Sequence, residues 1–130
     1  MKKYFEWCEA KNKKHVDLSA LMGKIVTNIL INDEHDVILF VCSDDEVYKM
    51  YHEQDCCESV GIEDISGNLE DLLNTPITMA EEESNSSETE WGSCTWTYYK
   101  LATVKGYVTL RWCGESNGYY SESVDVIQVQ

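Results

Sequence analysis

One short stretch of the chain gathers an imidazole, several carboxylates and two adjacent thiols: His52-Glu53-Gln54-Asp55-Cys56-Cys57-Glu58. Such groups can bind a metal ion, form a nucleophile or fix a loop through hydrogen bonds. Zinc is disfavoured, because adjacent cysteines point in different directions, a C-x-x-C spacing is absent and no second His/Cys cluster lies nearby. A thiolate nucleophile is disfavoured because the neighbouring acids raise a thiol pKa. The third interpretation is a structural loop with one cysteine packed inward.

A second stretch has the composition of a hairpin turn: Gly114-Glu115-Ser116-Asn117-Gly118-Tyr119-Tyr120-Ser121-Glu122. Asn-Gly adopts positive φ easily, which favours a turn. The same stretch has the groups that bind a planar ligand. Tyr119 and Tyr120 point to opposite faces of a strand, so one can enter the core while the other stacks on a base. Asn117 can pair with a base edge, and Gly118 allows the backbone to approach closely.

Arg111, the only arginine of the chain, lies just upstream and can hold a phosphate through two parallel hydrogen bonds. Trp112 is another ring that can stack, and His52 another group that can bond to a ribose hydroxyl. The alternative for Arg111 is a surface ion pair with the acidic body of the chain. The full set of candidate ligand-binding residues is Arg111, Trp112, Asn117, Gly118, Tyr119, Tyr120, His52, Asp55, Cys56, Cys57 and Glu58.

Sequence signatures of catalysis are absent from the chain. It has no phosphate-cradling glycine-rich loop, no H-E-x-x-H, no G-x-S-x-G and no Rossmann fingerprint. We therefore expect a binding protein rather than an enzyme, with no catalytic residue, no metal and no cofactor.

The elements that must position these residues are mostly strands. Runs of β-branched and aromatic residues predict strands over residues 24–31, 37–42, 47–51, 60–65, 77–80, 95–102, 107–112 and 119–129. Short polar turns join the first three, which predicts an antiparallel meander. Asn68 is a candidate N-cap for a short helix that ends before Pro76. The sequence thus predicts an α+β fold, a mostly antiparallel twisted sheet of six to eight strands with one or two short helices.

Composition divides the chain into unequal parts. Residues 1–20 hold five of the ten basic residues, interleaved with aromatics, and predict an arm or short helix that folds onto the acidic body or a neighbouring subunit. Residues 21–130 predict a single β-rich domain. Within it, residues 81–92 are acidic and rich in serine, which predicts a flexible loop.

The net charge is −14, from 10 basic and 24 acidic residues. Such a surface repels nucleic acids and anionic lipids, so we expect no direct nucleic-acid or membrane contact. The acidity either keeps the protein soluble or mimics a nucleic acid to occupy a basic groove on a partner. Without a signal peptide or a long apolar run, we expect a cytoplasmic protein with six reduced cysteines. The open strand edges and high aromatic content favour a homo-oligomer.

Two elements resemble an uncharacterised family of small phage and prophage proteins: Gln54-Asp55-Cys56-Cys57-Glu58 and Asn117-Gly118-Tyr119-Tyr120. The Leu-x-Gly-Lys stretch at residues 21–24 and the Leu-Glu-Asp-Leu stretch at residues 69–72 are similar too. That group is in turn similar to the type-one Thoeris anti-defence proteins, which sequester cyclic ADP-ribose signals without degrading them. The resemblance implies a symmetric oligomer with sites between subunits, acting in a bacterial host cell.

The function expected first is therefore a phage-encoded anti-defence protein that sequesters a cyclic nucleotide signal. The alternative is an acidic protein-binding inhibitor that mimics nucleic acid and blocks a basic host protein, such as a CRISPR effector. A third is a weak hydrolase that uses His52 with Cys56 or Cys57.

Overall fold

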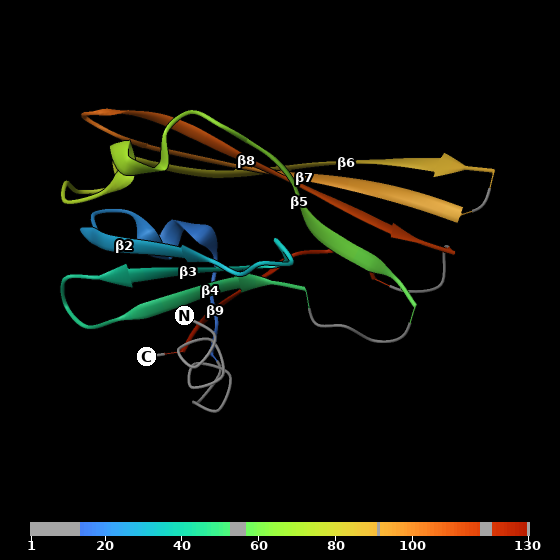
Figure 1. Ribbon diagram of the computed structural model, residues 1–130, viewed down its shortest axis with the longest axis horizontal. Helices are drawn as coiled ribbons and strands as arrows, with labels where there is room; N and C mark the ends of the chain where they lie inside the picture. Colours follow the sequence, from blue (N-terminus) through green and yellow to red (C-terminus); the bar gives the residue numbers. More distant parts are fainter. Residues whose placement is uncertain (1–13, 53–56, 91, 118–120, 130) are drawn as a thin grey trace.

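The computed structural model describes residues 14–52, 57–90, 92–117 and 121–129 (Figure 1). Most of the predicted N-terminal arm lies outside these ranges. So do Asp55 and Cys56 of the first motif, and Gly118, Tyr119 and Tyr120 of the second. The stacking role predicted for the two tyrosines therefore remains a prediction.

Two antiparallel sheets form the described part of the chain, one above the other in Figure 1. The first has the strand order β1-β9-β4-β3-β2 and the second has the order β5-β8-β7-β6. The strands are β1 (Lys14–His15), β2 (Val26–Ile31), β3 (Val37–Cys42), β4 (Val47–Tyr51), β5 (Ser59–Ser66), β6 (Met79–Thr89), β7 (Gly92–Thr103), β8 (Gly106–Ser116) and β9 (Asp125–Gln128).

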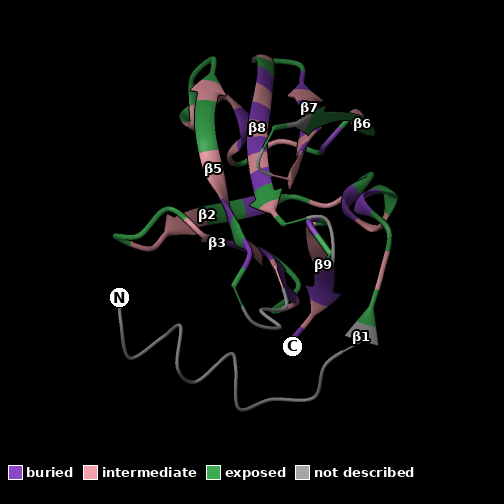
Figure 2. Ribbon diagram, turned by 90° about the vertical axis from the view of Figure 1, so that its right-hand side faces the viewer, coloured by how far each residue is buried: buried purple, intermediate pink, exposed green. Residues whose placement is uncertain are grey.

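The main core lies between the two sheets, because alternate residues of each strand face inward. Phe40, Tyr99 and Trp112 are all almost fully buried there. Figure 2 shows the resulting alternation of buried and half-buried residues along β8. Trp112 lies on the inward face of β8, and its neighbour Arg111 lies on the outward face.

A second apolar cluster occupies the other face of the five-stranded sheet. It includes Leu39, Val47 and Ile127, all at most 2% exposed. Lys49 is also buried on β4, and its Nζ lies 4.2 Å from the centroid of the Tyr51 ring. Burial of both faces explains why residues 37–42 are continuously apolar rather than alternating.

The antiparallel pairing predicted from the sequence is confirmed, but the α+β class is not. The described residues hold no α-helix, only the 3₁₀ turns η1 (Leu18–Leu21) and η2 (Leu69–Leu72). Asn68 does cap η2, since its Oδ1 accepts from the Glu70 amide at 3.0 Å. The chain leaves η2 after one turn, and Asn74 then adopts a positive φ of 66°. In the described residues the strands form two sheets in place of the single predicted sheet.

The flexible loop predicted for residues 81–92 is wrong. Residues 79–89 form β6, and each of them pairs with a residue of β7. The partner strand is strongly β-prone, and the polar β6 sequence suits an exposed edge strand that pairs on one side only. The strand predicted for residues 119–129 is shorter in the structure, where β9 covers Asp125–Gln128. None of the helical turns in the described ranges is long and apolar enough to cross a bilayer.

Candidate functional site

The fold brings the described residues of the two sequence motifs together at one end of the sandwich. His52 directly follows β4, and Glu58 directly precedes β5, in which Ser59 pairs with Glu115 of β8. Ser123 directly follows the second motif and lies beside His52. Its carbonyl oxygen is 2.6 Å from His52 Nδ1. We call this end of the molecule the loop end, formed by residues 57–59, 88–90, 115–117 and 121–123.

A buried pair of ionisable side chains joins the motifs. His52 Nε2 lies 2.7 Å from Glu58 Oε2, and the two side chains are 3% and 0% exposed. Nδ1–H donates to the Ser123 carbonyl, so both ring nitrogens face oxygen. Either the imidazole carries both ring protons, or Glu58 carries the second proton. In both cases the ring has no nitrogen left for a metal ion or a substrate. This disfavours zinc binding and a hydrolase as interpretations of His52.

Glu122 is a second buried acid, and three hydroxyl groups hold it. Its Oε1 accepts from Thr95 Oγ1 at 2.8 Å, and its Oε2 accepts from the Ser93 and Ser116 hydroxyls. Burial raises the pKa of Glu122, but the three hydrogen bonds outweigh burial and hold the pKa below its usual value. The carboxylate is therefore ionised at neutral pH and ties residues 121–123 to β7 and β8.

Gly114 allows this close packing. A Cβ at position 114 would lie 2.6 Å from the Glu122 carbonyl oxygen and 3.1 Å from Val60 Cγ2. The residue must therefore be a glycine for the returning segment to lie against β8. Sequence reasoning placed Gly114 and Glu122 in the turn motif without assigning them a role, and it missed Ser93 and Thr95, which belong to a different strand.

Arg111 lies on the outer face of the four-stranded sheet. Its Nη2 lies 2.9 Å from Glu63 Oε1, and both side chains are about two-fifths exposed, at 38% and 41%. The structure thus shows the alternative reading of this residue, a surface ion pair. Because Glu63 already holds the guanidinium, a phosphate would have to displace a carboxylate.

Replacing Arg111 with alanine is expected to change the free energy of unfolding by less than about 1 kcal/mol, because exposed ion pairs contribute little. Urea denaturation of Arg111→Ala and of Glu63→Gln measures this. Nearly equal, small effects are expected for both. A loss of several kcal/mol in the arginine variant would show that the guanidinium has a structural role beyond the ion pair.

Trp112 cannot stack on a ligand in this structure. The side chain is fully buried between the sheets, and its Nε1–H donates to Met50 Sδ at 3.2 Å. Its assignment to the ligand-binding set is therefore wrong. Neighbouring residues on a strand point to opposite faces, so Trp112 and Arg111 cannot belong to one pocket.

The remaining described members of the set lie near the loop end. Asn117 and Cys57 are both exposed. Cys57 is in a disulfide, so the prediction of six reduced cysteines is wrong at this position. Cys42, Cys94 and Cys113 are free thiols, as predicted.

Two hollows flank the buried ionisable groups. One of about 240 Å³ is lined by Glu82, Ser84, Thr95, Thr97, Ser121, Glu122, Ser123 and Val124. Another of about 520 Å³ is lined by Asn32, Glu34, Asp36, Val37, Tyr51, His52 and Val60. Hydroxyls and carboxylates dominate the first lining, the second includes the Glu34 and Asp36 carboxylates, and neither lining has a lysine or arginine. Such walls suit cationic or neutral groups better than phosphates.

The chain belongs to a known protein family, whose model matches residues 19–126 and which is described as a domain of unknown function (DUF7448). The match covers most of the chain and includes both sequence motifs. No curated protein matches the chain. No solved structure matches it either.

Proposed function

We propose that this protein is a non-catalytic binding protein that docks its acidic loop end against a basic surface of a partner protein. The observation that carries the proposal is that the chain's own groups engage its described basic side chains, while carboxylates stay exposed. Each Lys or Arg side chain that the structure describes is ion-paired, hydrogen-bonded or buried. The pairings are Lys24 with Asp44 and Glu46, Lys100 with Glu83, Lys105 with the Leu73 carbonyl and Arg111 with Glu63, while Lys49 is buried.

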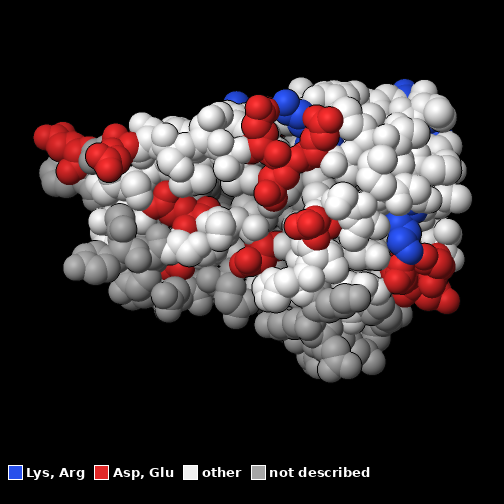
Figure 3. Space-filling view, turned by 180° about the vertical axis from the view of Figure 1, so that it is seen from behind, with Lys and Arg blue, Asp and Glu red and all other residues white. Residues whose placement is uncertain are grey.

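Carboxylates, in contrast, extend into solvent at the loop end. Glu88 and Glu90 lie at the tip of the β6–β7 hairpin, and Glu115 lies near the end of β8; all three are exposed. In Figure 3 the tip on the left is red, and the blue atoms lie away from it. An acidic surface with no cation beside it attracts basic partners and repels nucleic acid directly. It therefore favours a protein-binding inhibitor that mimics nucleic acid.

The buried ionisable groups support binding over catalysis. Both nitrogens of His52 and both oxygens of Glu122 are bound by the chain's own groups. Ionisable groups are costly to bury, so a use for them is expected. In this proposal, His52 and Glu122 hold residues 121–123 of the loop end in place for a partner.

Sequestration of a nucleotide signal remains a prediction that depends on the resemblance. Each Lys or Arg side chain that the structure describes is already engaged or buried, so none of these is ready to bind its phosphates. Assembly into a homo-oligomer is likewise a prediction. β6 is an edge strand, so its outer backbone edge offers one way for two copies to pair.

Competition with nucleic acid tests the proposal. The protein is titrated into preformed complexes of fluorescent DNA or RNA with bacterial nucleic-acid-binding proteins, including a CRISPR effector and a restriction endonuclease. We expect displacement at near-stoichiometric amounts from at least one complex, read as a fall in fluorescence anisotropy. Lysozyme, a basic protein without a nucleic-acid groove, serves as the control and is not expected to bind.

A second arm of the experiment tests the competing functions. The protein is mixed with cyclic ADP-ribose isomers and cyclic dinucleotides, removed by filtration and heated to release any ligand. Depletion with intact recovery would support sequestration in place of our proposal, and depletion with new products would support an enzyme. The proposal predicts no depletion.

A further inference from the structure

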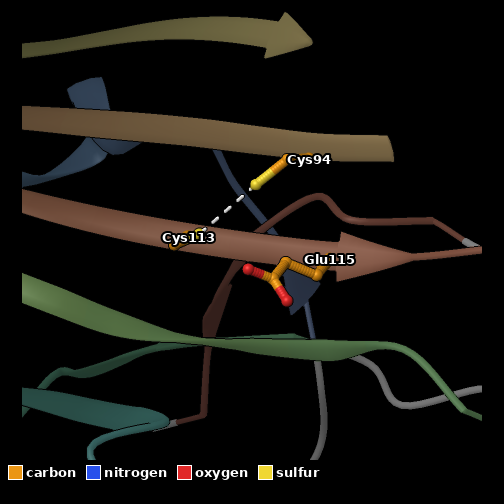
Figure 4. A group of neighbouring side chains, drawn as sticks. All are labelled: Cys94, Cys113 and Glu115. Carbon is orange, nitrogen blue, oxygen red and sulfur yellow. Dashed lines mark hydrogen bonds between the residues drawn. The ribbon is translucent and has the colours of Figure 1, made fainter. Parts of the chain in front are cut away.

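Two free cysteines meet a glutamate of the loop end, Glu115, on the outer face of the four-stranded sheet. Cys94 of β7 and Cys113 of β8 have their Sγ atoms 3.6 Å apart (Figure 4). A carboxylate oxygen of Glu115 completes the group, with the three ligand atoms all within 4.8 Å of one another. Cys94 is buried, Cys113 is half-buried and Glu115 is exposed, so solvent reaches the group from one side.

The strand register makes a disulfide between these thiols unfavourable. Cys94 pairs with Glu115, and Cys113 pairs with Trp96, so the two cysteines are diagonal neighbours. Diagonal positions on antiparallel strands are about 7–8 Å apart. Most disulfides need Cα atoms roughly 4.4–6.8 Å apart. The thiols thus come close without the backbone separation that favours an S–S bond.

The same separation fits two sulfur ligands of one metal ion. A tetrahedral zinc ion with Zn–S bonds of about 2.3 Å holds its sulfurs roughly 3.8 Å apart, close to the observed 3.6 Å. We propose that Cys94, Cys113 and Glu115 form a binding site for a thiophilic divalent metal ion such as zinc, with the fourth position open to water. This differs from the sequence-based expectation of no metal, which considered only the cysteines near His52.

Neighbouring groups fit this assignment. Gly61 of β5 lies opposite Cys113 in the register and adds no side chain there, while the Glu63 carboxylate of the same strand lies beside the Cys113 thiol. A metal ion binds the thiolate form of cysteine, so binding at two cysteines releases protons. Binding involves no redox step and should tighten as the pH rises.

The intact protein is first treated with a chelator and a phosphine reductant. Titration with Co²⁺, followed by competition with Zn²⁺, then tests the site. We expect one Co²⁺ per chain, with thiolate-to-cobalt charge-transfer bands and the strong visible bands of tetrahedral cobalt. Loss of an outer-shell partner alone lowers metal affinity about 10- to 100-fold. Cys94→Ser and Cys113→Ser remove direct ligands, so each should weaken binding by more than about 100-fold.

Glu115→Gln should weaken metal binding less than the cysteine variants do, and it should leave the fold unchanged. It therefore still tests the site if a serine variant fails to fold. Cys42→Ala is the matched control, since it removes a buried thiol of the other sheet and should leave Co²⁺ binding unchanged. Three results would overturn the proposal: no thiolate–cobalt bands in the wild type, equal binding by Cys113→Ser and Glu115→Gln, or a Cys94–Cys113 disulfide in protein purified in air.

Discussion

Replacing His52 with leucine is expected to lower the free energy of unfolding by about 3 kcal/mol or more, a large part of the roughly 5–15 kcal/mol available to a domain. The substitution removes the imidazole that contacts the buried Glu58 carboxylate at 2.7 Å and leaves the Ser123 carbonyl without its donor. Breaking a buried pair on one side costs more than replacing both members, because the remaining charge stays buried.

A double-mutant cycle in urea checks this account. The variant that combines His52→Leu with Glu58→Leu should recover part of the stability lost in the single variants. His35→Asn is the control, since His35 is exposed and asparagine tolerates its positive φ of 58°. Additive losses in the cycle would contradict the direct coupling of His52 and Glu58.

Removing the Glu122 carboxylate should have the second large effect. Glu122→Ala takes the shared acceptor from Ser93, Thr95 and Ser116, which lie in a partly buried cluster. A loss of about 2–4 kcal/mol is expected in urea denaturation, since several polar groups lose a charged partner. Glu122→Gln should cost less, because its amide keeps an acceptor and the hydroxyls can reorient. Equal losses in the two variants would mean that packing, not hydrogen bonding, dominates.

The same carboxylate gives the protein a definite pH dependence. The pKa of Glu122 in the folded state lies below its ordinary value of 4.5. A lowered carboxyl pKa stabilises the fold above the unfolded-state pKa, and this contribution is lost as the pH falls through the folded-state pKa. Acid unfolding of Glu122→Gln should therefore show a smaller loss of stability below about pH 4.5 than the wild type. An unchanged acid profile would exclude Glu122 as a contributor.

The strands of the core could be predicted from the sequence, because their signals are local. Residues 37–42, 95–102 and 107–112 are rich in β-branched and aromatic residues, and all three runs form strands. β6 was missed because its stability comes from pairing with β7 and not from its own serines and glutamates. The split into two sheets depends on long-range packing, which no local pattern contains.

The candidate site was found only in part, for a similar reason. The described residues of both motifs lie at or beside the loop end, but their roles depend on partners distant in the sequence, such as Ser123 for His52 and Ser93 for Glu122. The alternation along β8 already put Arg111 and Trp112 on opposite faces, yet both were assigned to one ligand. Applying the strand periodicity to the site would have separated them.

Localising the acidic surface tests the central claim most directly. Two triple variants each remove three negative charges from the net charge of −14. One variant changes the loop end through Glu88→Gln, Glu90→Gln and Glu115→Gln. The matched control changes exposed acids elsewhere through Asp33→Asn, Asp64→Asn and Glu70→Gln.

Both variants are titrated against a nucleic-acid complex that the wild type displaces, at physiological salt. The account predicts that the loop-end variant needs at least about ten times more protein for half-displacement, whereas the control stays within about twofold of the wild type. Equal displacement by the two variants would contradict the claim, since the interaction would then depend on total charge and not on the loop end.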